Sequence, residues 1–304
     1  MSKYYVLFNP LAGNKTGEES AKKLLNVQSL KDENLVFADM TKIESYKDFM
    51  DKIEDDDKLI LAGGDGTINR FVNDTADIKI SNDIYYYATG TGNDFLHEFG
   101  LGKGTEPFLL NKYIKDLPTV TINGKKQKFL NGIGFGIDGY CCEIGDKLRA
   151  TSDKPVNYTS IAIKGLLFYY KPTSATVTVD GKKHHFKKVW IAPTMNGKFY
   201  GGGMMTAPDQ DRLNEDGTLT TVLMHGAGRL RTLMVFPSIF KGEHIKHTKT
   251  VAVLTGREIE VEFDSPRALQ IDGETVLGVK KYSVSGISRR STEATASLSS
   301  DTAR

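Results

Sequence analysis

Cysteine is nearly absent from this chain of 304 residues, and long apolar runs are missing altogether. The only two cysteines are the neighbours Cys141 and Cys142, which cannot join distant segments through a disulfide. The most apolar stretch, residues 160–170, is interrupted by Lys164 and falls short of the roughly 20 apolar residues that a membrane-spanning helix needs. The first residues also lack the apolar core and cleavage site of a signal peptide. We therefore expect a cytosolic protein without a disulfide framework.

No strong excess of charge marks the whole chain, whose formal net charge is +2, but the two ends differ. Residues 1–100 carry 11 Lys and Arg against 18 Asp and Glu, whereas residues 101–304 carry 29 against 20. A basic second part suits anionic lipid headgroups or nucleic acid as a partner. An unevenly charged, solvated surface gives the same totals, so charge by itself decides nothing.

The first 120 residues alternate short apolar runs with amphipathic segments. Strands are predicted at residues 4–8, 35–38, 58–62 and 84–88, and helices at residues 18–26, 45–53 and 68–75, with Thr16 as a helix cap. Strands that alternate with helices through short glycine turns predict a parallel sheet covered by helices. The fold class expected for this part is therefore α/β.

The pattern changes after Pro118 to alternating strands. Two of them end in Asn123-Gly124 and Asp180-Gly181, which are strong hairpin signals, and helices interrupt them near residues 160–170 and 229–240. An antiparallel β-sandwich domain is predicted at residues 121–278, with the last strand, near residues 279–288, joining the α/β domain of residues 1–120. Residues 289–304 are rich in Ser, Thr and Ala and are expected to form a disordered tail.

The most informative motif is Gly63-Gly-Asp-Gly-Thr67, where a buried strand runs through three glycines into a helix. Backbone without side chains lets N–H groups approach phosphate oxygens, and the helix N-terminus adds a favourable dipole. A carboxylate beside a phosphate is repulsive unless a cation lies between them. Asp65 therefore indicates Mg²⁺, and Thr67 supplies a hydroxyl donor. A tight strand-to-helix turn without a ligand is the alternative.

This motif resembles the one shared by diacylglycerol kinases, sphingosine kinases, NAD kinases and, more distantly, phosphofructokinases. Five further segments resemble bacterial diacylglycerol kinase-like lipid kinases in the family's order: Asn9-Pro-Leu-Ala-Gly13, Gly90-Thr-Gly-Asn-Asp-Phe95, the strand at residues 131–138, Leu213-Asn-Glu-Asp-Gly-Thr-Leu219 and Ile271-Asp-Gly-Glu274. The resemblance spans residues 4 to 287. It implies an α/β nucleotide-binding domain followed by a β-rich lipid-substrate domain.

The resemblance also implies roles for individual residues. It places the nucleotide and its Mg²⁺ at Asn9, Pro10, Gly13, Thr41, Gly63, Gly64, Asp65, Gly66, Thr67, Asn69, Thr91, Asn93 and Asp94. Glu274 matches the family's general base, which accepts the proton of the attacking hydroxyl, and Asp272 is expected to orient it or to contact metal. Taken alone, Asp272-Gly273 is an ordinary hairpin turn, and Asn93 is an ordinary helix cap.

A second metal site is implied at Leu213, Asp216 and Thr218. Asp216 would provide its carboxylate, and the other two residues their backbone carbonyls. Another Asp-Gly turn is the alternative, and Thr218 stands where the family usually has an apolar residue. Such a site would hold a loop in place, away from the nucleotide.

The expected function is that of an ATP- and Mg²⁺-dependent lipid kinase with diacylglycerol as its expected acceptor. A kinase for phosphatidylglycerol or a sphingoid base, an NAD kinase-type enzyme and a non-catalytic lipid-binding protein stay open as alternatives. The expected partners are ATP and a lipid at an anionic membrane surface, on the inner face of the membrane. A homodimer is compatible with the sequence, and a nucleic-acid partner is not expected because no known module accompanies the basic part.

Two segments are candidates for contact with the membrane. Residues 160–171 are apolar with flanking lysines, and residues 228–241 are basic and aromatic. Either segment fits an amphipathic element at the membrane interface, and either fits a helix of the protein core. The six histidines show no metal-ligand spacing.

Overall fold

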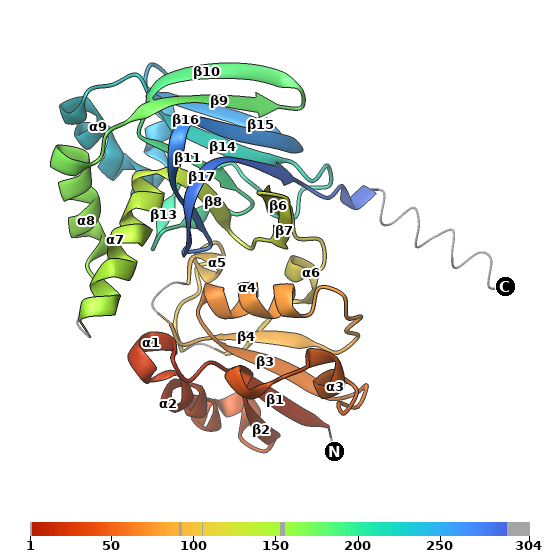
Figure 1. The fold of residues 1–304 in the computed structure, drawn as a ribbon. Coiled ribbons are helices and arrows are strands. Elements are labelled where there is room, and N and C mark those ends of the chain that lie inside the picture. Colours follow the sequence, from red (N-terminus) through yellow and green to blue (C-terminus); the bar gives the residue numbers. More distant parts are fainter. Residues whose placement is uncertain (1, 91–92, 105, 153–155, 291–304) are drawn as a thin grey trace. The chain divides into compact units, whose positions relative to one another are not determined.

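The computed structural model describes residues 2–90, 93–104, 106–152 and 156–290. Within it, the chain divides into two compact units, Met1–Lys115 and Asp116–Arg304. Each unit has its own sheet (Figure 1). No helix among the described residues is long and apolar enough to cross a membrane.

The first unit contains a five-stranded sheet in the order β2-β1-β3-β4-β5. Its strands are β1 (Lys3–Phe8), β2 (Asn34–Asp39), β3 (Lys58–Gly63), β4 (Ile84–Ala88) and β5 (Phe108–Leu109). The first four strands pair in parallel, and β5 adds an antiparallel edge. The α/β class predicted from the alternating pattern is confirmed.

Helices cover both faces of this sheet. The helices of the unit are α1 (Ala12–Lys15), α2 (Gly17–Lys22), η1 (Lys23–Asn26), η2 (Gln28–Leu30), η3 (Met40–Lys42), α3 (Tyr46–Met50), α4 (Asp65–Asp74), α5 (Asp94–His97) and α6 (Asn111–Ile114). Ala21 and Leu24 pack with Val6 and Ile60 on one face. On the other face, α3 and α4 bring Tyr46 and Phe71 edge to face. Ser45 caps α3 through its hydroxyl, whereas Thr16 makes no side-chain cap to α2.

The second unit is built on an antiparallel ten-stranded sheet. Its strands are β6 (Thr119–Ile122), β7 (Lys125–Lys128), β8 (Gly132–Gly136), β9 (Thr173–Val179), β10 (Lys182–Val189), β11 (Ile191–Met195), β14 (Leu219–Met224), β15 (Val251–Gly256), β16 (Glu258–Ile271) and β17 (Glu274–Ser285), and a separate ribbon contains β12 (Phe199–Tyr200) and β13 (Met204–Met205). The long strand β16 pairs with β9 in its first half and with β8 in its second half. Register shifts between Glu262 and Leu269 separate the halves, so one strand serves both layers of the sandwich.

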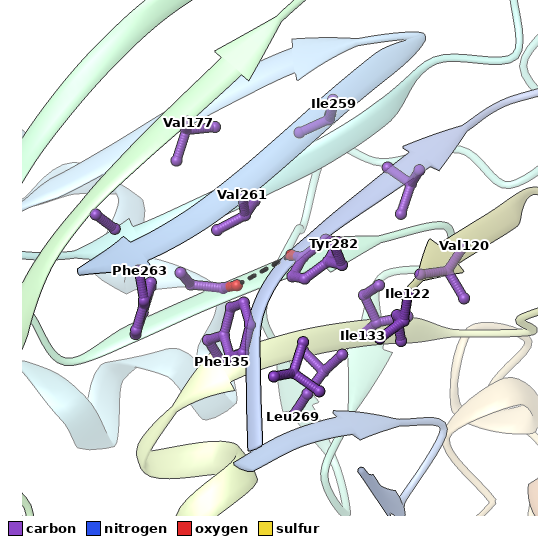
Figure 2. Packing of buried hydrophobic residues seen from close by; sticks show 14 of the residues in the cluster. Val120, Ile122, Ile133, Phe135, Val177, Ile259, Val261, Phe263, Leu269 and Tyr282 are labelled. Atoms are coloured by element: carbon purple, nitrogen blue, oxygen red, sulfur yellow. Dashed lines mark hydrogen bonds between the residues drawn. The ribbon is translucent and has the colours of Figure 1, made fainter. Parts of the chain in front are cut away.

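Apolar side chains from both halves of β16 meet in one core (Figure 2). Phe135 on β8 stacks on Phe263 at 4.7 Å between ring centroids, and Tyr282 on β17 lies 5.3 Å from Phe135. The Tyr282 hydroxyl is fully buried and lies 2.9 Å from Thr194 Oγ1, so its polar group is satisfied. Alternating inward-facing residues therefore build the predicted β-sandwich.

The helices of the second unit are α7 (Ile137–Thr151), α8 (Tyr158–Lys164), the π-helical turn η4 (Gly165–Tyr169), α9 (Arg229–Val235), η5 (Phe236–Lys241) and η6 (Glu243–Lys246). The interruptions predicted near residues 160–170 and 229–240 are present. The sequence did not reveal α7, the longest of these helices, because glycines and cysteines blur its apolar stripe. Gly139 explains part of this composition, since a Cβ there would lie 2.0 Å from the carbonyl oxygen of Ala268.

The last strand differs from its expected place. We expected residues near 279–288 to join the α/β domain, but β17 pairs with β16 and β6 in the second sheet. Val279, Tyr282 and Val284 are buried there. The strand itself was therefore expected correctly, but its partners were not.

Candidate active site

Four loops leave the first sheet at the carboxyl ends of its parallel strands. Phe8 aligns with Asp39 and Ala62, and Gly63 aligns with Ala88, so the segments that follow these residues start from one edge. The nucleotide residues expected from the sequence all belong to these segments or to the first turns after them. Ligands of open parallel sheets bind at this edge.

The glycine motif is held by very close backbone packing. A Cβ on Gly63 would lie 2.0 Å from Thr67 Oγ1, and a Cβ on Gly90 would lie 3.0 Å from Gly64 Cα. The Gly63 carbonyl accepts hydrogen bonds from the N–H groups of Thr89 and Gly90 at 2.8 and 3.2 Å. The glycines at these positions are therefore needed by the protein itself. Gly66 is different, because a Cβ there would meet nothing within 4 Å.

Asp65 begins α4, is only 7% exposed, and connects the glycine motif to the next loop. One carboxylate oxygen accepts a hydrogen bond from the N–H of Phe95 at 3.2 Å, and the other lies 3.4 Å from the Tyr86 hydroxyl. Asn93 donates from its side chain to the Gly90 carbonyl at 3.0 Å. Asp65 thus has a structural role at this edge whatever ligand the edge binds.

Tyr86 was not singled out by the sequence, although it lies at the centre of this network. Its hydroxyl is within 3.4 Å of the Gly63 carbonyl, Asp65 and Asn93 Oδ1, and its single proton serves one acceptor at a time. Burial raises the pKa of Tyr86 well above its usual value, and the negative charges of Asp65 and Asp94 add to that effect. Two buried carboxylates therefore lie near one hydroxyl.

The first loop is a compact turn after β1. Asn9 Oδ1 accepts a hydrogen bond from the N–H of Leu11 at 2.9 Å, and the Pro10 carbonyl accepts one from the N–H of Gly17. A Cβ on Gly17 would lie 1.9 Å from the Asn9 carbonyl oxygen, so α2 approaches the turn closely. Gly13 lies in α1, two residues before its end. The sequence did not single out Gly17.

Thr41 lies in η3, after β2, and its side chain already has a partner. Its N–H and its hydroxyl both donate to Asp39 Oδ1, at 2.8 and 2.7 Å. Burial raises the pKa of Asp39, but these hydrogen bonds and the charge of Lys42 outweigh burial and bring the pKa below its usual value. Asn69 is buried on α4 and accepts from the Asn73 side chain at 3.2 Å. Thr91 lies outside the described residues.

The catalytic residues expected in the second unit lie on the hairpin between β16 and β17. Asp272 and Gly273 have φ of 47° and 90° and form a two-residue turn. The Asp272 carboxylate accepts hydrogen bonds from the N–H groups of Leu130, Asn131 and Gly132 at 2.5 to 3.0 Å. Three backbone donors occupy most of the acceptor capacity of one carboxylate. This geometry suits a residue that positions the hairpin better than one that binds metal.

Glu274 is the first residue of β17 and is exposed. Its backbone pairs with Ile271, and the buried side chain of Gln270 accepts the Gly273 N–H at 2.8 Å, so the turn that presents Glu274 is rigid. An exposed carboxylate on a rigid turn is available to accept a proton.

The loop expected to bind a second metal is held by side chains of the protein. The Thr218 carbonyl accepts hydrogen bonds from the amide groups of Gln210 and Asn214, each at 2.9 Å. The Asp216 carboxylate lies 3.3 Å from Arg290 Nε. Gly217 packs closely on the segment after β17, since a Cβ there would lie 2.3 Å from the Ile287 carbonyl oxygen.

These contacts do not fit the expected metal site. Two donors already use the lone pairs of the Thr218 carbonyl, and a guanidinium is the cation next to Asp216. We therefore assign no metal-dependent step to Leu213, Asp216 or Thr218.

The chain thus combines an α/β unit, whose loops start from one sheet edge, with an antiparallel β-sandwich unit. Residues 3–121 match the family model described as the diacylglycerol kinase catalytic domain. Residues 131–283 match the model of the YegS C-terminal NAD kinase beta sandwich-like domain. The chain belongs to the diacylglycerol kinase family of lipid kinases, as the sequence motifs predicted.

Curated relatives agree with this assignment. A diacylglycerol kinase of Mycobacterium tuberculosis is 26% identical over 213 residues, covering 68% of this chain and 67% of the relative. A diacylglycerol kinase of Bacillus subtilis is 27% identical over 225 residues, covering 72% and 71%. The crystal structure of a diacylglycerol kinase from Bacillus anthracis superposes with a TM-score of 0.61 at 20% identity and covers 93% of each chain, which confirms the fold.

Proposed function

We propose that this lipid kinase transfers the γ-phosphate of ATP to the hydroxyl of diacylglycerol and forms phosphatidic acid. The observation that carries the proposal is the glycine motif at the sheet edge, in which Gly66 leaves open backbone beside the N-terminus of α4. The relatives named as diacylglycerol kinases support the choice of acceptor.

The nucleotide residues of the proposal come from the first unit. Backbone N–H groups at the start of α4 suit phosphate oxygens, because no side chain intervenes at Gly66 and the helix dipole favours negative charge there. The loop after β4 is fixed to this turn through Asp65 and through the Gly63 carbonyl, which accepts the N–H groups of Thr89 and Gly90, so the two loops present one preorganised surface. Asn9 and Thr41 extend that edge.

Magnesium is the cation that we propose for the nucleotide. Asp65 and Asp94 gather negative charge near Tyr86, and a divalent cation bound with the phosphates would offset that charge. Carboxylate and amide oxygens are the ligand types that Mg²⁺ prefers, and this edge supplies them. The cation would neutralise charge that develops on the transferred group.

Glu274 is the residue that we propose as the general base, with Asp272 as a positioning residue. When the lipid oxygen attacks the γ-phosphorus, the bond from that phosphorus to the β–γ bridging oxygen breaks and ADP leaves. Glu274 accepts the proton that the hydroxyl loses. Asp272 holds the turn through three backbone N–H groups, so its effect reaches the reaction through the orientation of Glu274.

The acceptor is a membrane lipid, so we propose that the protein acts at an anionic membrane surface. A kinase for phosphatidylglycerol or a sphingoid base is the second candidate, because the same chemistry serves any primary hydroxyl.

The test is the transfer of γ-³²P-phosphate from ATP to diacylglycerol, phosphatidylglycerol, sphingosine and NAD, with and without Mg²⁺. We expect label on diacylglycerol that requires Mg²⁺ and that falls by about 10²–10⁴ in rate in Glu274→Gln. The matched control is Glu243→Gln, which removes an exposed carboxylate of η6 in the same unit. Near-normal turnover of a folded Glu274→Gln variant contradicts the base assignment, and label on another acceptor alone contradicts the choice of lipid.

A further inference from the structure

The helices at one end of the second unit expose apolar side chains where a surface helix normally carries polar ones. Phe168 and Tyr169 of η4 are 68% and 65% exposed, and Leu230 and Met234 of α9 are both 74% exposed. The opposite sides of the same segments are buried, through Leu166, Val235 and Ile239. These segments are therefore apolar on both sides.

The two exposed stripes lie beside each other. Arg229 at the start of α9 donates to the Leu166 carbonyl of η4 at 2.7 Å and lies over the Trp190 ring at 5.5 Å. Figure 1 shows α8 and α9 at the same end of the second sheet. The exposed sides of residues 163–169 and 230–241 thus form one surface, which we call the aromatic-basic surface. Exposed apolar patches of this kind mark interaction sites.

Charge indicates what this surface contacts. Residues 157–171 and 226–242 contain no Asp or Glu, but they carry Lys164 and Lys171 in the first segment and Arg229, Arg231 and Lys241 in the second. Lys164, Arg231 and Lys241 are exposed. Among the ion pairs of the described residues, none uses these three cations, whereas the acids of neighbouring α7 pair with Lys147 and Arg149 on the same helix.

We propose that the aromatic-basic surface docks the protein on an anionic lipid bilayer. Phe168, Tyr169, Leu230 and Met234 enter the boundary between headgroups and acyl chains, while the lysine and arginine side chains extend to the anionic headgroups. A second copy of the chain is a poorer occupant. Two-fold pairing would bring these cations together in a desolvated interface without carboxylates from either segment.

This inference deepens the proposed function and rests on it for the nature of the acceptor. A kinase whose substrate stays in the bilayer gains from a surface that holds it there, because docking raises the local concentration of substrate. The surface involves none of the residues assigned to nucleotide binding or proton transfer, so docking and phosphoryl transfer are separable by mutation.

The test is co-sedimentation with vesicles of equal parts phosphatidylcholine and phosphatidylglycerol. We expect the variants Phe168→Ser/Tyr169→Ser and Leu230→Ser/Met234→Ser each to bind at least about tenfold more weakly than the unmodified protein. Arg231→Glu/Lys241→Glu should weaken binding similarly, and vesicles of phosphatidylcholine alone should bind poorly. Melting temperatures report whether each variant stays folded.

Two controls match these changes. Leu25→Ser removes an exposed leucine of the first unit, and Lys125→Glu/Lys126→Glu reverses two exposed lysines on β7, so neither should alter vesicle binding by more than about twofold. Vesicle binding that survives in all three surface variants overturns the proposal. So does a surface variant that loses self-association, measured by sedimentation velocity, but keeps its vesicle binding.

Activity measurements separate this inference from the proposed function. Surface variants should phosphorylate soluble dioctanoylglycerol at the unmodified rate and lose activity only on diacylglycerol embedded in vesicles. Equal loss on both presentations overturns the docking role. If the unmodified protein phosphorylates no lipid, but its vesicle binding still depends on the surface, then the proposed function fails and the docking surface stands.

Discussion

His244 shows how one buried side chain ties the stability of the second unit to pH. It is fully buried, its Nε2 lies 2.9 Å from the Thr206 carbonyl oxygen, and its Nδ1 has no hydrogen-bond partner in the structure. The Nε2–H tautomer satisfies this arrangement. Protonation would create a buried N–H at Nδ1 without an acceptor, which is why burial lowers the pKa of His244 below its usual value.

We expect the free energy of unfolding of the second unit to fall as pH decreases below about 6.5. The unfolded chain binds a proton near that pH, whereas the folded chain binds it only at the lower folded pKa. The contribution of one histidine has a slope of at most about 1.4 kcal/mol per pH unit. Fluorescence of Trp190, the only tryptophan, follows unfolding of this unit between pH 7.5 and 5.0.

His244→Gln should flatten that slope, because glutamine keeps an N–H donor and does not titrate. The control is His185→Gln on exposed β10, which should leave the slope unchanged. An unaltered slope in His244→Gln, together with a flattened one in His185→Gln, contradicts the assignment.

Asp272 illustrates how far sequence reasoning reaches at the scale of single residues. The turn Asp272-Gly273 was predictable, because Asp-Gly between apolar runs is a strong hairpin signal. The three N–H groups that its carboxylate accepts come from residues about 140 positions earlier, and no local pattern reveals contacts at that distance. Tyr86 was missed for the same reason, since its neighbour Asp65 belongs to another element.

At the scale of elements, α4 and its glycines give a prediction in which stability and binding change in opposite directions. Gly66 is exposed within α4, and a Cβ there would meet no atom within 4 Å. Gly66→Ala should therefore stabilise the protein by about 0.5–1 kcal/mol. The same methyl group would stand where we propose that phosphate approaches the backbone. We expect the Kd for ATP, measured by calorimetry, to rise at least about tenfold.

Gly102→Ala is the matched control, because a Cβ there also meets nothing within 4 Å and its φ is not positive. It should leave ATP binding unchanged. If Gly66→Ala binds ATP as tightly as the unmodified protein, phosphate does not approach the backbone at this residue.

The elements themselves were mostly predictable, and their neighbours were not. The strands of the first sheet follow from apolar runs, and α4 begins at Asp65, three residues before its predicted start, with Gly64 as its N-cap. The helix α7 was missed, and its Gly139 is required by contact with β16 rather than by any helical preference. Helix propensity therefore did not predict α7, because packing between elements selects residues such as Gly139.

At the scale of the whole molecule, the segment after β17 returns to the loop of residues 212–216. The Arg289 N–H donates to the Glu215 carbonyl at 2.9 Å, and its side chain donates to the Arg212 carbonyl at 3.3 Å. Arg290 lies between Glu215 and Asp216, at 3.2 and 3.3 Å. The Arg290 pairs are well exposed and contribute little, so Arg289 is the stronger link.

A chain that ends at Ile287 should therefore unfold more easily than one that ends at Arg290, by about 1–2 kcal/mol. Comparing these two chains isolates residues 288–290, and Trp190 fluorescence in urea measures the difference. Equal urea midpoints for the two truncated chains would show that residues 288–290 do not hold the loop.

In the full chain, Mg²⁺ without nucleotide should not raise the melting temperature, since the side chains of Gln210 and Asn214 already hold the loop of residues 212–218.

The domain organisation was the easiest feature to anticipate at this scale, because the change from helix–strand alternation to hairpins falls near Pro118. The place of β17 was not anticipated. Strand partners depend on which apolar faces meet, and the chain has several strands with equivalent alternation. The loop expected to bind a second metal shows the same limit. Its motif identified the expected ligands but not the side chains of Gln210 and Asn214, which donate to the Thr218 carbonyl.

The double pairing of β16 has a consequence for synthesis on the ribosome. Strand β16 pairs with both β8 and β9, and these two strands are translated more than 80 residues before the middle of β16. Until that late strand leaves the exit tunnel, the apolar faces of the earlier strands have no permanent cover. We therefore expect nascent chains of the second unit, and truncated products that lack β16, to be prone to aggregate.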